Sequence, residues 1–414
     1  MIAIVNGEVM TMTHGTIPKG TVLIDGRRIV AVGRDVGPIP PGAKVFDAQG
    51  KVVTPGLIDA HCHTGIFADG VAPTEADGNE MTDPVTPHLR AIDAIHPEDM
   101  AFKDLREAGV TTINTGPGSG NLIGGQFACL KTKKTTTIEE MLLLAPSGMK
   151  MALGENPKRV YGGQKKMPST RMGNAAELRS TLVAAQNYRD KWARYAEKRA
   201  RYEDDLPHWE AKPEDKREQR PQPPEPPERN LKLESLIPVL EGKLRAMIHC
   251  HRTDDILTAV RIAEEFGLRF SLEHATEGYK VAELLAGKRI PCVVGPILFS
   301  RVKYELRELT PRNPGILSKA GVKVAIQTDE ASAVRYLTMN AALAVQQGMD
   351  EEEALKAITI NPAEIIGVAD RVGSLEAGKD ADVVVFSGHP LDYRSVAELV
   401  LIDGQVEYER AKAT

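Results

Sequence analysis

The sequence predicts an α/β fold, either a parallel barrel or a doubly wound sheet, with a small β-sandwich built from both ends of the chain. The middle of the chain alternates short apolar runs with amphipathic helical patterns, which is typical of parallel sheets. Both ends contain alternating apolar and polar runs separated by turn residues, which is typical of antiparallel strands. A chain of 414 residues is long enough to bury the core of a barrel and that of an accessory domain.

The two β-rich ends share one sequence pattern, in which short apolar runs are separated by turn residues. Residues 1–54 contain turn signals such as Asn6-Gly7 and Asp25-Gly26, and residues 372–414 contain the apolar run 383–386 and a hairpin signal at Asp403-Gly404. We expect these ends to pair into one accessory sandwich and residues 55–371 to form the barrel.

The middle of the chain contains short apolar runs that we expect to be the barrel strands. They are residues 52–58, 110–114, 148–153, 245–249, 269–274, 290–294 and 322–326. Helical patterns such as residues 254–266 separate several of them. One more strand would complete an eightfold barrel.

A charged insertion at about residues 175–230 interrupts this alternation. A predicted helix with aromatic residues at 188, 192, 195 and 202 is followed by a proline-rich stretch at 207–229. We interpret the insertion as a solvated helical excursion with a stiff connector, and a lid or a subunit contact is the alternative.

Composition and charge indicate a cytoplasmic protein that acts on small molecules. The net charge of −5 and the pI near 6.1 argue against nucleic acid or anionic membrane as partners. The first residues lack a signal peptide pattern, and no run approaches the about 20 apolar residues of a membrane span. The four scattered cysteines suit reduced core thiols better than disulfides. We expect a small-molecule substrate and a homo-oligomer.

Histidines and an aspartate follow the predicted strands. His61 and His63 are two residues apart, so they point to the same side of an extended chain and can bind one ion. His249, His274 and Asp329 close later strands. A parallel barrel collects strand ends on one face, and these side chains are ligands that suit Zn²⁺ and similar divalent ions.

Four motifs resemble those of the amidohydrolase superfamily, in particular its imidazolonepropionase-related metal-dependent hydrolases. They are residues 55–63 (PGLIDAHCH), 272–274 (LEH), 327–329 (QTD) and 373–382 (GSLEAGKDAD), and the resemblance extends over nearly the whole chain. It implies a (β/α)₈ barrel of the TIM type with a β-sandwich from both termini. It also implies that His61, His63 and Asp329 hold one metal, while His249 and His274 hold a second when two are present.

Two ligand assignments stay open at this point. His249 and His251 share a phase, and we favour His249 as the ligand with His251 facing the substrate. The fourth strand offers Lys150, as a carbamylated bridging lysine of the kind found in some family members, or Glu155 at the strand end. We favour Glu155 because its carboxylate needs no added chemistry.

The predicted reaction is hydrolysis of a C–N bond outside a nucleobase, in a dipeptide, an N-acyl amino acid or a cyclic amide. A metal-activated water attacks the carbonyl, and Asp329 accepts its proton and passes it to the leaving nitrogen. Arg159, Tyr161 and Arg171 are candidates to bind a substrate carboxylate.

Two other functions compete with this prediction. A deaminase of an amino-heterocycle is the nearest rival, although the residues after His249, Cys250 to Thr253, contain no glutamate of the kind that deaminase branches carry there. A non-catalytic scaffold with the same barrel would lack metal ligands, and none is evidently missing.

Overall fold

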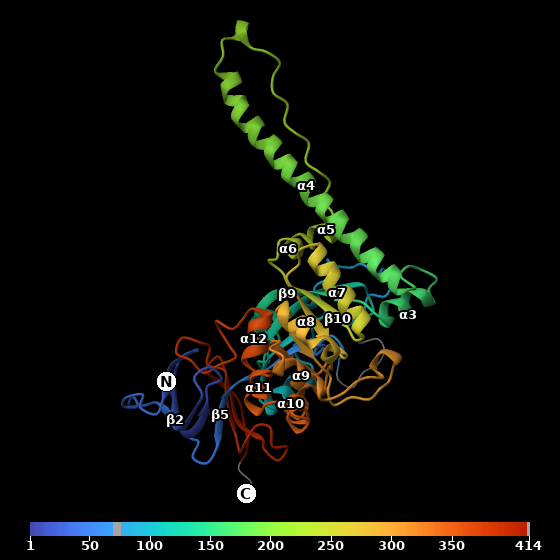
Figure 1. The fold of residues 1–414 in the computed structure, drawn as a ribbon. Helices are drawn as coiled ribbons and strands as arrows, with labels where there is room; N and C mark the ends of the chain where they lie inside the picture. The colour runs from blue at the N-terminus through green and yellow to red at the C-terminus, as the bar shows by residue number, and fades with distance from the viewer. Residues whose placement is uncertain (69–75, 412–414) are drawn as a thin grey trace.

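The computed structural model describes residues 1–68 and 76–411, which form a barrel, a β domain and a projecting arm (Figure 1). The barrel sheet has the order β13-β12-β11-β10-β9-β8-β7-β6. Its strands are β6 (Leu57–Cys62), β7 (Val110–Thr115), β8 (Ile123–Lys131), β9 (Leu142–Ala152), β10 (Ala246–Cys250), β11 (Phe270–His274), β12 (Cys292–Val294) and β13 (Val324–Ile326). The sheet nearly closes, because the amide of Asp329, just after β13, donates to the carbonyl of His61 in β6 at 3.2 Å.

The predicted barrel is confirmed, but its β/α alternation is less regular than the sequence indicates. In the described part of the chain, β8 runs antiparallel to both of its neighbours, whereas the other barrel strands are parallel to one another. Strand β8 is the additional strand that brings the barrel to eight. It begins inside the glycine-rich stretch at residues 116–126, whose sequence is more typical of a loop. Gly116 lies under the Phe127 ring, where a Cβ would come within 2.2 Å of the ring, so close packing explains a glycine there.

Both ends of the chain join in a second sheet, as predicted. Its order is β16-β15-β14-β5-β1-β2-β3, with β4 also paired to β1. The strands are β1 (Ile2–Met10), β2 (Thr16–Asp25), β3 (Arg28–Gly33), β4 (Lys44–Asp47), β5 (Val52–Pro55), β14 (Val383–Phe386), β15 (Ala397–Ile402) and β16 (Gln405–Glu409). Antiparallel pairing of β5 with β14 connects the two ends.

Helices cover the outside of the barrel. They are α1 (Met100–Glu107), α2 (Ile138–Met141), α3 (Glu155–Gly163), α5 (Leu231–Glu234), α6 (Ile237–Leu240), α7 (Thr253–Glu265), α8 (Ala282–Gly287), α9 (Asn313–Lys319), α10 (Leu337–Gln346), α11 (Glu351–Lys356) and α12 (Ile360–Ile366). Helix α7 buries Ile256 and Val260 at helical spacing in the same core cluster as Ile248 of β10. Each such side chain stabilises the fold by about 1.5–3 kcal/mol. The four cysteines are buried free thiols, as expected.

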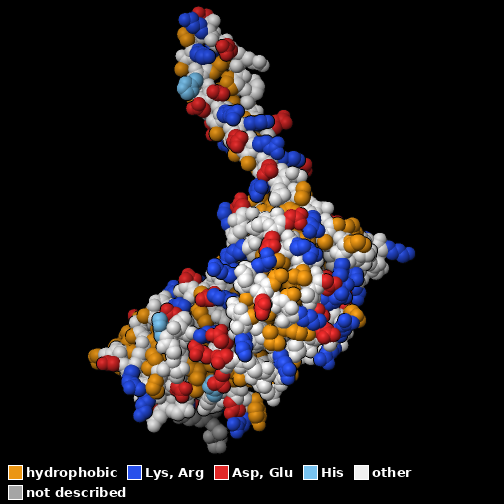
Figure 2. All heavy atoms as spheres, viewed as in Figure 1, with side chains coloured by type: hydrophobic (Ala, Val, Ile, Leu, Met, Phe, Trp, Pro, Cys, Tyr) orange, Lys and Arg blue, Asp and Glu red, His pale blue; other side chains and the backbone are white. Residues whose placement is uncertain are grey.

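The insertion forms an arm that projects away from the barrel (Figure 1). Helix α4 (Arg171–Glu210) is longer than predicted, and its first half packs on the barrel through buried residues such as Leu178 and Leu182. The proline-rich segment returns along the outer half, where the prolines at 221, 224 and 227, spaced three residues apart, are half-buried. This period matches a polyproline II helix with one face on α4. Lys, Arg, Asp and Glu side chains mix along the arm surface (Figure 2).

None of the described helices is apolar over a stretch long enough to cross a membrane.

A buried cluster of charges ties the barrel to the β domain. Lys131, at the end of β8, is 3% exposed and its Nζ lies 2.6 Å from Asp380, 3.1 Å from Asp382 and in contact with Asp403. Burial opposes the charged ammonium, but Asp382 and Asp403 raise its pKa above the ordinary value. The lysine therefore stays charged and compensates carboxylates that come from the other domain.

Replacing Lys131 by Met should lower the free energy of unfolding by about 3–5 kcal/mol, because the buried carboxylates lose the cation that they share. Urea unfolding followed by circular dichroism measures the change. Lys134→Met, at an exposed neighbouring lysine, is the control and should change stability by less than about 0.5 kcal/mol. Equal stability of the two variants would contradict a stabilising role of the cluster.

Candidate metal centre

The predicted ligands lie together at the carboxyl ends of the parallel strands. His61 belongs to β6, His249 to β10 and His274 to β11, while His63 and Asp329 follow β6 and β13. Parallel strands place these ends on one face of the barrel, where the sites of this fold lie.

The first cluster consists of His61, His63 and Asp329. The Oδ1 atom of Asp329 lies 3.2 Å from Nε2 of His63 and 3.6 Å from Nε2 of His61. The two histidine side chains are almost completely buried, whereas that of Asp329 is 31% exposed. A substrate can therefore reach the aspartate, while the imidazoles are shielded from solvent.

The second cluster consists of His249, His251 and His274, whose potential ligand atoms all lie within 4.8 Å of one another. The ring centroids of His249 and His274 are 4.3 Å apart. His274 also connects the two clusters, because its Nε2 lies 3.9 Å from Oδ1 of Asp329.

Hydrogen bonds at Nδ1 orient most of these imidazoles. The Nδ1 atom of His61 lies 2.8 Å from the Glu273 carboxylate, and those of His63 and His274 lie 2.7 Å and 2.9 Å from the carbonyls of Gly116 and Gly295. A hydrogen on Nδ1 that is donated to these oxygens leaves a lone pair on Nε2. This is the usual arrangement behind metal-binding histidines.

Four ring nitrogens of the second cluster have no hydrogen-bond partners among the described residues. They are both ring nitrogens of His249 and Nε2 of His251 and His274, all buried. Burial lowers the pKa of His249 and His251 well below the ordinary value and that of His274 to about 3, so these rings are neutral. Buried, neutral and unpaired imidazoles fit a divalent metal.

Lys150 of β9, rather than Glu155, lies next to this centre. Its side chain is completely buried, and its Nζ lies 2.8 Å from Nε2 of His61. Burial lowers the pKa of Lys150 to about 8, which increases the share of neutral amine.

The structure gives no support to Glu155 as the fourth-strand ligand. Glu155 is the first residue of α3, and its Oε2 accepts a hydrogen bond of 3.2 Å from the amide of Glu305. The amide of Glu155 in turn binds the Glu305 carboxylate at 3.0 Å. The chain turns at Gly154, which has a φ of 88°, before Glu155, so the carboxylate is directed to a neighbouring loop.

The three candidate substrate-binding residues contact the surrounding loops. Tyr161 is buried and its hydroxyl binds Asn121 at 2.8 Å, while Arg171 pairs with Asp255 at 3.0 Å. Arg159 is exposed on α3. None of them contacts the histidines, so a direct role in binding stays a prediction.

Sequence reasoning missed two charged residues, Lys303 and Glu305, in the loop after β12. Glu305 is completely buried, and its Oε1 lies 2.9 Å from Nζ of Lys303 and 3.7 Å from Nε2 of His251. The loop has no strand or helix periodicity that would place it, so its position follows from tertiary contacts. The nearest signal is Glu305 itself, a carboxylate within a loop after a barrel strand.

The backbone is strained at two of the proposed ligands. His274 and Asp329 have φ values of 66° and 56°, in the left-handed region that residues with a Cβ rarely adopt. Each such residue costs about 1–3 kcal/mol, and such strain is concentrated at functional sites.

A relative of known structure decides the family. The amidohydrolase of Thermotoga maritima is 42% identical to this chain, covers 99% of it and 100% of its own length, and superimposes with a TM-score of 0.88. The chain belongs to the amidohydrolase superfamily. It is therefore a hydrolase of C–N bonds, and the family predicted from the four motifs is confirmed. The amidohydrolase family model also matches residues 242–407 of this amidohydrolase.

Curated relatives are more distant. The amidohydrolase TasK of Hapsidospora irregularis is 28% identical over 94% of this chain, which spans only 40% of the length of TasK. The imidazolonepropionase of Shouchella clausii is 24% identical over 90% of this chain and 80% of its own length. These enzymes support hydrolysis of a C–N bond and leave the substrate of this amidohydrolase to be determined.

His63→Asn and His274→Asn should each lower the bound divalent metal by about one ion per chain, because each removes a nitrogen ligand. Mass spectrometry of the metal in Zn²⁺-loaded, desalted protein measures the change. His208→Asn, on the exposed arm, is the matched control and should keep the full metal content. Full metal content in both site variants would contradict the proposed ligands.

Proposed function

We propose that this amidohydrolase hydrolyses a dipeptide or N-acyl amino acid, with zinc as its metal. The observation that supports the proposal is the convergence of two histidine clusters on Asp329, whose Oδ1 lies within 3.9 Å of Nε2 of His61, His63 and His274. His61, His63 and Asp329 would hold one ion, and His249 and His274 a second. Bound metal polarises the scissile carbonyl and acidifies water.

Asp329 is the proposed proton carrier. Its side chain is 31% exposed, in contrast to the buried imidazoles around it. Its carboxylate accepts a proton from the attacking water as a general base. It then donates that proton to the leaving nitrogen as a general acid, which completes the cleavage of the C–N bond.

Lys150 is the proposed bridging group of the fourth strand. Reaction of its neutral amine with CO₂ would release a proton and convert the amine into a carbamate, whose oxygens resemble those of a carboxylate. The 2.8 Å distance between its Nζ and Nε2 of His61 supports this assignment over Glu155.

His249 is the proposed ligand of its strand, and His251 the proposed substrate contact. Neither ring nitrogen of His249 has a hydrogen-bond partner among the described residues. His251 is held through Nδ1, which lies 2.7 Å from the Thr276 hydroxyl, and its Nε2 remains directed toward Glu305. An oriented imidazole of this kind can donate or accept a hydrogen bond to the substrate.

Lys303 supports a substrate that carries a carboxylate. Its side chain is 20% exposed, and its ammonium lies 2.9 Å from Glu305 and 3.4 Å from the side-chain oxygen (Oδ1) of Asn156. Glu305 thereby fixes a cation beside His251, where it can form a charge-assisted hydrogen bond to the substrate. Dipeptides and N-acyl amino acids provide such a carboxylate, whereas a neutral lactam does not.

Asp329→Asn should lower kcat by about 10²–10⁴-fold, because the amide cannot carry a proton between water and leaving group. A hydrolysis screen over dipeptides, N-acyl amino acids and lactams with added Zn²⁺ or Mn²⁺ identifies the substrate for this assay. Asp205→Asn, at an exposed arm residue, is the control and should retain full activity. Undiminished hydrolysis by Asp329→Asn would refute the proton-carrier role, and inactivity of the wild type on the whole panel would refute the substrate class.

Lys303→Met should lower kcat/KM for the free-acid substrate by about 10–100-fold, the worth of one hydrogen bond to a charged group. The same substrate with an amidated carboxyl group should lose less than about 3-fold, because it offers no negative charge. Lys198→Met, on the exposed outer half of the arm, is the control. Equal losses for the acid and the amide would show that Lys303 does not recognise the carboxylate.

A further inference from the structure

A cavity lies at the opposite end of the barrel from the histidines. Its volume is about 620 Å³, within the range of sites for small molecules. Three of the residues that line the cavity immediately precede barrel strands. Arg245 precedes β10, Arg269 precedes β11 and Lys323 precedes β13. The cavity is therefore built on the amino ends of strands whose carboxyl ends carry His249 and His274.

The lining is strongly cationic. It contains Arg245, Arg269, Lys288, Arg289 and Lys323 but only one carboxylate, Glu364. That carboxylate pairs with Lys323, and Lys288 pairs with Glu264 at 2.5 Å. Both lysines are thereby neutralised locally, which leaves the three guanidinium groups.

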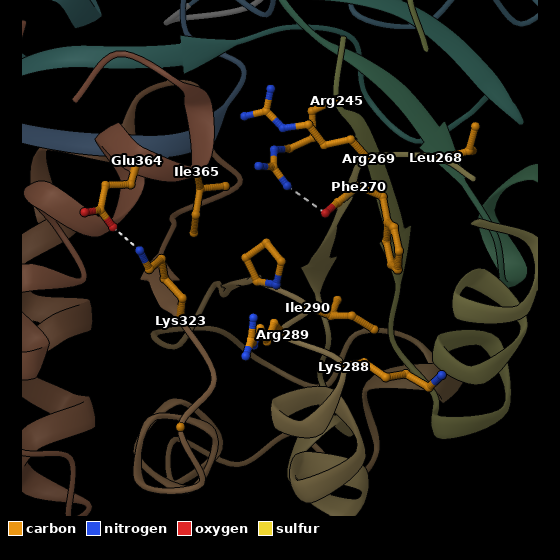
Figure 3. A pocket seen from close by; sticks show the side chains of 12 residues that line it. Arg245, Leu268, Arg269, Phe270, Lys288, Arg289, Ile290, Lys323, Glu364 and Ile365 are labelled. Atoms are coloured by element: carbon orange, nitrogen blue, oxygen red, sulfur yellow. Dashed lines mark hydrogen bonds and ion pairs between the residues drawn. The ribbon is translucent and has the colours of Figure 1, made fainter. Parts of the chain in front are cut away.

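No carboxylate forms an ion pair with these guanidinium groups among the described residues, although the charge of the buried Glu273 favours the charged form of Arg245. Arg245 donates to the carbonyl of Phe270 at 2.7 Å, while its Nε is buried and has no partner. The side chains of Arg269 and Arg289 make no hydrogen bond or ion pair within the part of the chain that the structure describes. Figure 3 shows Arg245 and Arg269 next to each other on one side of the cavity, with Arg289 across from them.

Placing like charges together in a concave wall is unfavourable unless an anion joins them. Burial, followed by the charge of Arg269, lowers the pKa of Arg245 to about 10. Several exposed arginines elsewhere on the molecule pair with carboxylates, such as Arg199 with Glu203 at 2.7 Å. The cavity differs from those sites because several cations line it together and its one carboxylate is already paired with Lys323.

We propose that this cavity binds a small phosphorylated anion, with its phosphate groups among Arg245, Arg269 and Arg289. Guanidinium groups match phosphate oxygens through paired N–H donors, and three of them suit a ligand with more than one negative charge. Phe270 and Ile365 also line the cavity and provide apolar surface for the uncharged part of such a ligand. The site uses none of the residues assigned to hydrolysis.

Inorganic pyrophosphate is the probe, titrated into the full-length metal-loaded protein by calorimetry at constant ionic strength. We expect saturable binding to the wild type and at least about 10-fold weaker binding to the double variant Arg269→Gln/Arg289→Gln, because two charge-assisted contacts are lost. Arg194→Gln/Arg201→Gln removes the same charge from exposed positions on the arm and should bind like the wild type. Circular dichroism confirms that the variants are folded.

Several outcomes would overturn the proposal. Absence of binding to the wild type would do so, and so would equal weakening in the two double variants, which would indicate a general effect of net charge. Vesicles of phosphatidylcholine with an anionic phospholipid test a lipid headgroup as the source of the phosphate. We expect no cosedimentation, and cosedimentation that depends on Arg269 and Arg289 would overturn a free small molecule as the ligand.

Discussion

The carboxylate of Asp59 joins the two edges of the barrel sheet, and the metal centre depends on that junction. Buried in β6, it accepts hydrogen bonds from the amide of His61 at 3.0 Å and from the amide and hydroxyl of Thr328 at 3.1 Å and 2.6 Å. Burial raises the pKa of Asp59 to about 7, although these hydrogen bonds oppose the shift. The contact sets Asp329 beside His61 and His63, which come from the other end of the barrel sequence.

The two ends of the barrel follow from one geometric rule. Parallel strands carry every carboxyl end to one face and every amino end to the other. Neutral, buried imidazoles therefore gather at one end, and cations that precede the strands gather at the other. Arg245 and His249 are the clearest pair, because Arg245 immediately precedes β10 and His249 lies near the carboxyl end of that strand. The proposed reaction and the proposed anion site can thus coexist without sharing a side chain.

The regular parts of the site were predictable, whereas the loops were not. His61 and His63 lie on one strand with a period of two, so their common direction follows from local geometry. Lys150 and Glu155 shared the same neighbourhood in the sequence, and only the turn at Gly154 separated them in space. Lys303 has no periodic pattern around it, because its position is determined by Glu305 and by the packing of its loop.

The sequence by itself determined the family, the β/α alternation with paired β-rich ends, and the residues able to bind metal, because strand periodicity and ligand chemistry are local properties. Tertiary structure alone decided the antiparallel course of β8, the approach of Lys150 to His61 and the convergence of Arg245, Arg269 and Arg289. These features depend on long-range strand pairing and on closure of the barrel. No local pattern of hydrophobicity or spacing records which distant residues will then become neighbours.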